Sequence, residues 1–151
     1  MPKLIVLFHG DDQAAASLAE SAAAGAKAVR FTEVDIRSAT ATGGPPKRIE
    51  SAAQLREYDG VLLAYAGDEA PAEARATLAE LANGEPMPNT VFGVTGVDAA
   101  ALQAVAQLGG IIVSQPRGAD GNESARQLGA RMAKVIGWVR HALGHEAEHT
   151  H

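Results

Sequence analysis

Residues 4–8 read Leu-Ile-Val-Leu-Phe, and His9-Gly10-Asp11-Asp12 follows them directly. A continuous apolar run of this length, rich in branched side chains, is typical of a β-strand that is buried on both faces. The two aspartates are suited to cap a helix over residues 13–24, and Gly25 is expected to end that helix. This segment therefore predicts a buried strand, a short polar loop and a helix.

The same alternation recurs along the rest of the chain. Residues 29–36 mix polar and apolar side chains, as an edge strand does, and the Gly-Gly-Pro-Pro stretch within residues 38–47 predicts a surface loop. Further strands are expected at 60–65, 90–95 and 111–113, and further helices at 51–57, 71–84, 98–108 and 122–144. Buried strands that alternate with helices predict a three-layer α/β doubly wound sheet. Five such units favour the flavodoxin-like parallel order 2-1-3-4-5.

Length and composition narrow the class of protein. The chain has 151 residues, 46% of them hydrophobic, which fits one domain; we assign it to residues 1–144 and treat residues 145–151 as a His-rich tail. There is no cysteine, and the net charge is −5. This charge disfavours binding to nucleic acid or to an anionic membrane surface. No segment has the length of a membrane span or the form of a signal peptide, so we expect a cytoplasmic protein.

The ends of the predicted strands indicate where a ligand would bind. In this fold, ligands lie beyond the carboxyl ends of the strands, here strands 1, 3 and 4. The residues after the strands include five carboxylates, against a single guanidinium: Asp11, Asp12, Asp68, Glu69, Asp98 and Arg117. Helix capping explains most of these acids, and a Mg²⁺ site is the alternative reading. Acids at a helix start compete with a bound phosphate.

Several segments resemble one flavoprotein family. Residues 3–29, with Ala-Ala-Gly-Ala-Lys at 23–27, resemble the first strand and helix of the flavodoxin-like quinone reductases named for tryptophan-repressor binding, the WrbA type. Residues 55–63, Leu-Arg-Glu-Tyr-Asp-Gly-Val-Leu-Leu, are similar to that family's Leu-x-x-Tyr-Asp-x-Ile-Ile segment. Residues 105–113 and 125–139, with Leu128-Gly129, resemble its fifth strand and final helix.

The resemblance implies a flavin mononucleotide (FMN) cofactor and reduction of quinones by NAD(P)H. The residues that it places at the flavin are Gly10, Gln13, Tyr65, Thr95 and Gly96. The loops depart from the family pattern, because the phosphate loop carries Gly10, Asp12 and Gln13 where the family has Ser, Tyr or Thr, and Gly. The loop after strand 3 is also short. We therefore expect a weakened FMN site in a shortened relative.

Two points remain open at this stage. The first is the alternative function, which is that of a flavodoxin-fold module that works through protein contacts without a cofactor. It includes a pseudo-receiver, because residues 58–64 resemble the phospho-acceptor strand of response-regulator receivers but have Ala64 at the acceptor position. We also expect a homo-oligomer, with Met132 and Trp138 of the last helix as anchors.

The His-rich tail is the second open point. His141, His145 and His149 are spaced one helical turn apart, and two such side chains can share a zinc or nickel ion. The sequence fixes no third ligand elsewhere. A solvated tail is therefore favoured, and no metal site is assigned.

Overall fold

The computed structural model describes residues 2–8, 13–38, 51–65, 72–95, 106, 110–113 and 121–149, and these residues form nine elements. They are β1 (Lys3–Phe8), α1 (Gln13–Lys27), β2 (Glu33–Ser38), the 3₁₀-helix η1 (Ala52–Glu57), β3 (Gly60–Ala64), α2 (Ala72–Ala82), β4 (Val91–Val94), β5 (Ile111–Ile112) and α4 (Gly121–His149). The helix expected at residues 98–108 lies almost wholly outside the described residues.

The five strands form one parallel sheet in the order β2-β1-β3-β4-β5, which confirms the predicted flavodoxin-like topology. The apolar runs become the central strands β1, β3 and β4, because these are the strands covered on both faces. The strand with mixed polarity, β2, lies at the edge as expected. The β1–β3 pairing aligns Phe8 with Ala64, so the two strands end at the same level.

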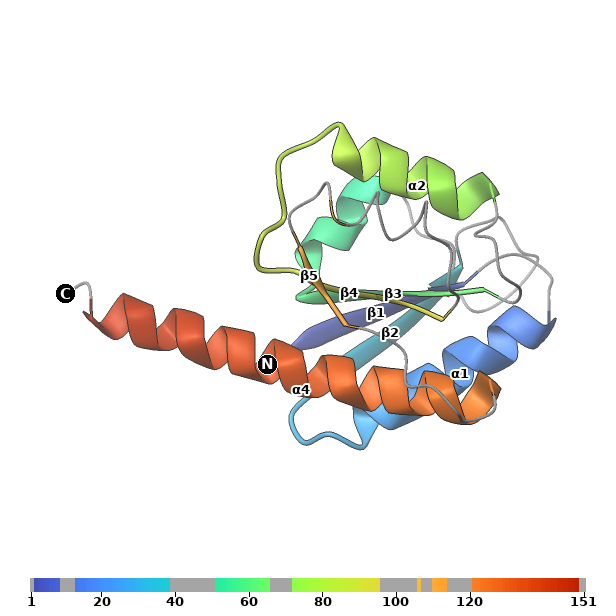
Figure 1. The fold of residues 1–151 in the computed structure, drawn as a ribbon, viewed down its shortest axis with the longest axis horizontal. Helices are drawn as coiled ribbons and strands as arrows, with labels where there is room; N and C mark the ends of the chain where they lie inside the picture. The colour runs from blue at the N-terminus through green and yellow to red at the C-terminus, as the bar shows by residue number, and fades with distance from the viewer. Residues whose placement is uncertain are drawn as a thin grey trace.

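Helices cover both faces of the sheet (Figure 1). On one face, η1 and α2 pack over alternate strand residues, including Ile5, Leu7 and Leu63. On the other face, α1 and α4 pack over the intervening residues, including Leu4, Val6 and Leu62. Successive side chains of each strand point to opposite faces of the sheet, so the core has two layers, as a doubly wound sheet requires.

Gly25 does not end the first helix, contrary to the prediction. It is buried inside α1, which continues to Lys27. A side chain at Gly25 would overlap the backbone carbonyl of Arg126 in α4, and one at Gly129 of α4 would overlap the carbonyl of Ala22. The two glycines therefore let the backbones of α1 and α4 come together, and close packing outweighs the usual cost of glycine in a helix.

The last helix also differs from the prediction, because α4 runs to His149 rather than ending near Gly144. Figure 1 shows its C-terminal part projecting beyond the sheet. Of its two expected anchors for an oligomer, Met132 is completely buried in the core, while Trp138 is 69% exposed. No helix in the described part of the chain has the length and apolar character needed to cross a membrane.

Candidate functional site

The carboxyl edge of the sheet is where the strand order reverses. Strand β1 has β2 on one side and β3 on the other, and these neighbours are reached by connections that cross opposite faces. A crevice at such a switch point is the usual ligand position of open α/β sheets. The described residues that border it are the ends of β1, β3 and β4 and the first turns of α1 and α4.

Thr95 fastens the ends of β3 and β4 to each other. Its Oγ1 accepts a hydrogen bond from the backbone N–H of Tyr65 at 3.0 Å and donates one to the Tyr65 carbonyl at 2.8 Å. The Thr95 N–H also donates to the Leu63 carbonyl at 3.1 Å. The hydroxyl expected to face a flavin is thus used to hold two strand ends in register.

Tyr65 lies at the predicted edge of the sheet, but its side chain is 1% exposed. The ring belongs to the core layer beneath α2, where Leu78, Leu81 and Val94 are also buried. A flavin ring needs aromatic or apolar surface that it can reach from solvent. The large exposed aromatic side chains among the described residues, Phe31 and Trp138, lie on other parts of the molecule.

The first turn of α1 contains no acidic residue, and its first residue, Gln13, is exposed. The start of a helix, with its backbone N–H groups and dipole, attracts anions. A hollow of about 480 Å³ lies between the first turns of α1 and α4 and is lined by Ala14, Ser17, Leu18, Gly121 and Asn122. The Oδ1 atom of Asn122 accepts hydrogen bonds from Ser17 at 3.2 Å and Ser21 at 3.4 Å, which links the two helices.

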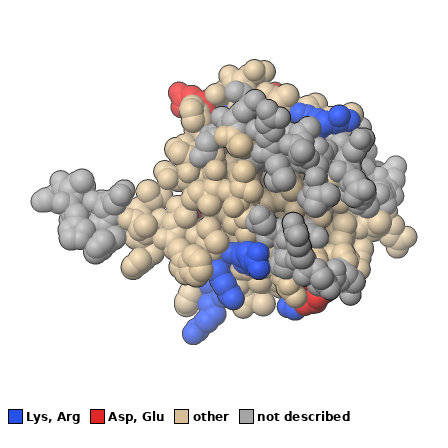
Figure 2. All heavy atoms as spheres, viewed as in Figure 1, with Lys and Arg blue, Asp and Glu red and all other residues tan. Residues whose placement is uncertain are grey.

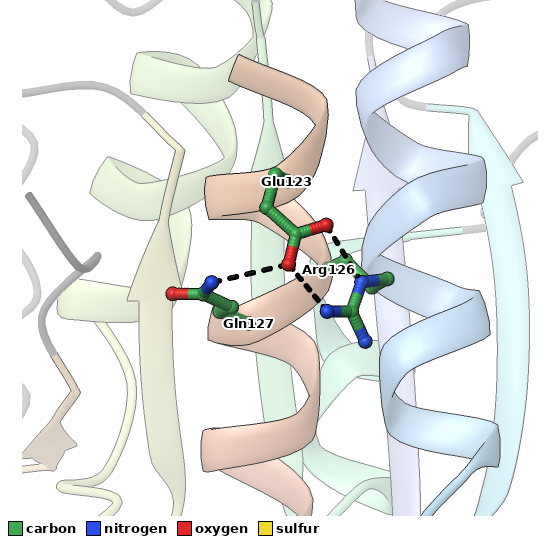
Figure 3. Close-up of polar contacts among 3 residues, drawn as sticks. All are labelled: Glu123, Arg126 and Gln127. Carbon is green, nitrogen blue, oxygen red and sulfur yellow. Dashed lines mark hydrogen bonds and ion pairs between the residues drawn. The ribbon is translucent and has the colours of Figure 1, made fainter. Parts of the chain in front are cut away.

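The first turn of α4 has a different electrostatic character, as Figure 3 shows. The Glu123 carboxylate accepts hydrogen bonds from Arg126, at 2.9 Å from Nε, and from Gln127 at 3.1 Å. These two partners, with Arg126 the stronger, lower the pKa of Glu123 to about 2. The first turn of α4 therefore carries an ionised carboxylate, whereas the first turn of α1 contains no acidic residue.

Several predicted site residues lie outside the described part of the chain. These are Gly10 and Gly96, together with His9, Arg117 and the five carboxylates after the strands: Asp11, Asp12, Asp68, Glu69 and Asp98. Of the residues expected at the flavin, the structure describes Gln13, Tyr65 and Thr95. It brings Tyr65 and Thr95 into direct contact.

A polar cluster at the opposite, amino edge of the sheet was not identified from the sequence. Asp59, just before β3, accepts hydrogen bonds from Arg140 of α4 at 3.1 Å and from the backbone N–H of Lys3 at 2.9 Å. Tyr58 donates to Asp35 of β2 at 2.7 Å. A hollow of about 210 Å³ beside them is lined by Arg56, Asn89 and Leu143, among others. Only the Tyr-Asp pair at 58–59 hints at it in the sequence, because the partners are distant along the chain.

The tail histidines do not form a described metal centre. His141 is exposed on α4, while the side chains of residues 145–149 lie outside the described set. Within the residues that the structure describes, no three His, Asp or Glu side chains are grouped closely enough to hold a metal ion.

Known structures share this architecture. A short-chain flavodoxin associated with a bacterial microcompartment is 12% identical, with a TM-score of 0.63 over 91% of this chain and 97% of the flavodoxin. A diflavin flavoprotein A3 from Nostoc sp. is 16% identical, with a TM-score of 0.60 over 95% of this chain and 97% of that structure. A flavodoxin from the domain Archaea is 13% identical, with a TM-score of 0.58 over 89% of this chain and 99% of the flavodoxin.

The chain has a flavodoxin-like fold. Its structural neighbours are flavodoxins and flavoproteins, and their low identity means that the likeness is one of fold. No protein-family model matches the sequence, and no curated protein is significantly similar to it.

Proposed function

We propose that this protein binds flavin mononucleotide weakly at the carboxyl edge of its sheet. The phosphate would lie at the start of α1, beside Gly10 and Gln13, and the ring system along the ends of β3 and β4, near Tyr65, Thr95 and Gly96. The observation that carries the proposal is the acid-free first turn of α1 at the point where the strand order reverses.

Three features make the proposed site weak. The Thr95 hydroxyl already holds the Tyr65 backbone, and the Tyr65 ring is buried beneath α2. Asp11 and Asp12 immediately precede α1 in the sequence. A dianionic phosphate beside two carboxylates is repelled by about 1 kcal/mol or more per pair at a surface dielectric. The proposed site is therefore a degenerate form of an FMN site.

When bound, the flavin would supply one- or two-electron transfer. The resemblance to the WrbA type suggests the finer proposal of a flavin-dependent NAD(P)H:quinone oxidoreductase. This finer activity rests on the sequence resemblance in the scaffold. It requires FMN binding as its first condition, so binding is the property to test.

The test is a titration of FMN with the purified full chain, in which binding is measured by the quenching of flavin fluorescence. A parallel titration uses riboflavin as the ligand. We expect saturable FMN binding and weaker riboflavin binding, because riboflavin lacks the phosphate. Gln13→Glu places a carboxylate in the first turn of α1 and is expected to weaken FMN binding about five- to tenfold. Asp12→Asn removes a carboxylate and is expected to strengthen it by a similar factor.

The control is Asn89→Asp, which adds the same charge in an exposed position beside the amino edge of the sheet. It should leave FMN affinity unchanged. Absence of any FMN signal in the wild-type chain and in Asp12→Asn would reject the proposal. Equal effects of Gln13→Glu and Asn89→Asp would show that FMN responds to net charge alone and not to a site at α1.

The second candidate is a flavodoxin-fold module without a cofactor, which includes the pseudo-receiver. It is favoured by the use of Thr95 and Tyr65 for internal contacts rather than for a ligand. Under this alternative, the titration gives no FMN signal, while the fold and its stability are unaffected by Gln13→Glu.

A further inference from the structure

The outer face of α4 carries an unusual combination of side chains. We define it by the residues on its solvent side, Gln127, Ala130, Arg131, Lys134 and Trp138. Together with Arg126 they line a shallow groove of about 390 Å³. Trp138 is the only tryptophan of the chain and is 69% exposed. Figure 2 shows Lys and Arg side chains gathered on the α4 side of the molecule.

The length of α4 leaves part of it without cover from its own chain. A helix of 29 residues is about 43 Å long, whereas a strand of six residues spans about 20 Å. The helix runs opposite to the strands, because its first turn borders α1 at the carboxyl edge and Arg140 reaches Asp59 at the amino edge. Beyond Arg140, Leu143 is 40% exposed, and a side chain at Gly144 would meet nothing within 4 Å.

We propose that the outer face of α4 is the interface of a homodimer, in which two copies of α4 pack antiparallel about a two-fold axis. The midpoint of the helix is Val135. An antiparallel copy centred there places its Trp138 at the level of Arg131 and Lys134 in the groove. The projecting turns of each copy then lie along the first half of the other α4. The proposal does not depend on flavin binding.

Self-complementarity is the argument for a second copy as the partner. A two-fold interface must contain both the protruding group and the recess that receives it. The outer face offers both: Trp138, which is 69% exposed, lines the groove on one side of the midpoint, and Ala130, a small residue, lines it on the other side. The recess is bordered by Arg131 and Lys134, whose cations bind an indole face when they approach within about 6 Å.

The two tryptophans would contribute part of the area that a dimer needs. Two tryptophans bury about 150–250 Å² each, and a standard interface buries about 1,600 Å² in total. The indoles would therefore supply roughly a quarter of such an interface, and the aliphatic stems of the basic residues would add to it. We expect a dissociation constant in the micromolar range.

The experiment is sedimentation equilibrium of the full chain from about 1 to 500 µM, with tryptophan emission recorded over the same range. We expect a monomer–dimer equilibrium, and emission that shifts to shorter wavelength as dimer forms, because Trp138 is the only indole. Trp138→Ala should raise the dissociation constant about 100-fold or more, since two anchoring tryptophans are lost per dimer. Ala130→Arg, which fills the groove, should have a similar effect.

The matched control is Phe31→Ala, because Phe31 is also 69% exposed but precedes β2 at another place on the surface. It should leave the dissociation constant unchanged. Circular dichroism checks that each variant is folded. A monomer across the whole range would overturn the proposal. So would a dimer that survives Trp138→Ala as well as it survives Phe31→Ala, or one that forms without any shift in emission.

Discussion

At the scale of single residues, Thr95 is the clearest example of a polar side chain with a defined task. It bonds both backbone groups of Tyr65 across the β3–β4 boundary. A partly buried donor and acceptor that lose their partner cost about 1–3 kcal/mol together with the lost hydrogen bonds. The Thr95 hydroxyl therefore stabilises the contact between the ends of β3 and β4 at the carboxyl edge.

Replacement of Thr95 tests this dependence. Thr95→Val keeps the shape but removes the hydroxyl, and we expect the free energy of unfolding to fall by about 2 kcal/mol. Thr95→Ser keeps the hydroxyl and should lose less than half of that. Urea unfolding of the two variants gives the comparison. Equal losses would mean that the methyl group, not the hydroxyl, holds the strand ends together.

Tyr58 carries a pH dependence that can be measured. Burial and the hydrogen bond to Asp35 raise the pKa of Tyr58 from 10.0 to about 12. A folded pKa above the unfolded one means that the Tyr58 contribution to stability is present below pH 10 and is lost as the pH rises towards 12. In Tyr58→Phe this part of the pH dependence should disappear.

The measurement is the ultraviolet titration of phenolate, taken as the difference between the wild-type chain and Tyr58→Phe. The difference should titrate near pH 12. Asp35→Asn removes the charged acceptor and should bring the midpoint down towards the ordinary value. A difference midpoint at pH 10 in the wild-type chain would contradict the Tyr58–Asp35 hydrogen bond.

At the scale of elements, the contact between α1 and α4 is set by glycine. Gly129→Ala places a Cβ onto the carbonyl of Ala22, so the helices must separate, and we expect a loss of about 2–3 kcal/mol. A side chain at Gly137 of the same helix meets nothing within 4 Å, so Gly137→Ala should stabilise by up to about 1 kcal/mol. Urea unfolding of the two variants at the same protein concentration compares the two. Equal shifts would contradict the close approach.

The same contact explains what sequence reasoning could and could not predict. The apolar runs predicted the central strands, because a strand that is buried on both faces is apolar along its whole length. The alternation of five strands with helices predicted their order. The role of Gly25 was not predicted from the sequence, because a glycine late in a helix can either end that helix or let another helix pack closely against it. Which of the two occurs depends on α4, whose Arg126 is about a hundred residues away in the sequence.

The candidate site could also be predicted only in part from the sequence. The position of Thr95 and Tyr65 at strand ends follows from the apolar pattern, and the structure places both there. The partner of the Thr95 hydroxyl and the burial of the Tyr65 ring depend on how β3 aligns with β4 and on what α2 covers. Neither is visible in a local stretch of sequence, so both residues were expected to face a ligand.

At the scale of the whole molecule, charge is unevenly distributed. The chain has a net charge of −5, with acidic residues after the strands, while α4 carries Arg126, Arg131, Lys134 and Arg140. At the proposed FMN site, a phosphate at the start of α1 would lie next in sequence to Asp11 and Asp12, which carry like charge. Salt screens charges separated by more than about 10 Å at 0.1 M ionic strength.

Ionic strength should therefore strengthen FMN binding rather than weaken it. Between 20 and 500 mM NaCl we expect the FMN affinity to rise a few-fold, because the repulsion from the acidic loops is screened. Riboflavin, which has no phosphate, should be nearly insensitive to salt. Fluorescence quenching titrations at both salt concentrations provide the measurement. A fall in FMN affinity would indicate that cations, not carboxylates, dominate the field at the site.

The direction of α4 has a practical consequence for handling the protein. The helix ends at His149, past the amino edge of the sheet, whereas any flavin would enter at the carboxyl edge. In a single copy, a chip tether or fluorescent label attached after this helix would stand a full sheet length away from the proposed flavin site. Immobilised monomers would then present the carboxyl edge of the sheet to the flowing solution in a uniform orientation.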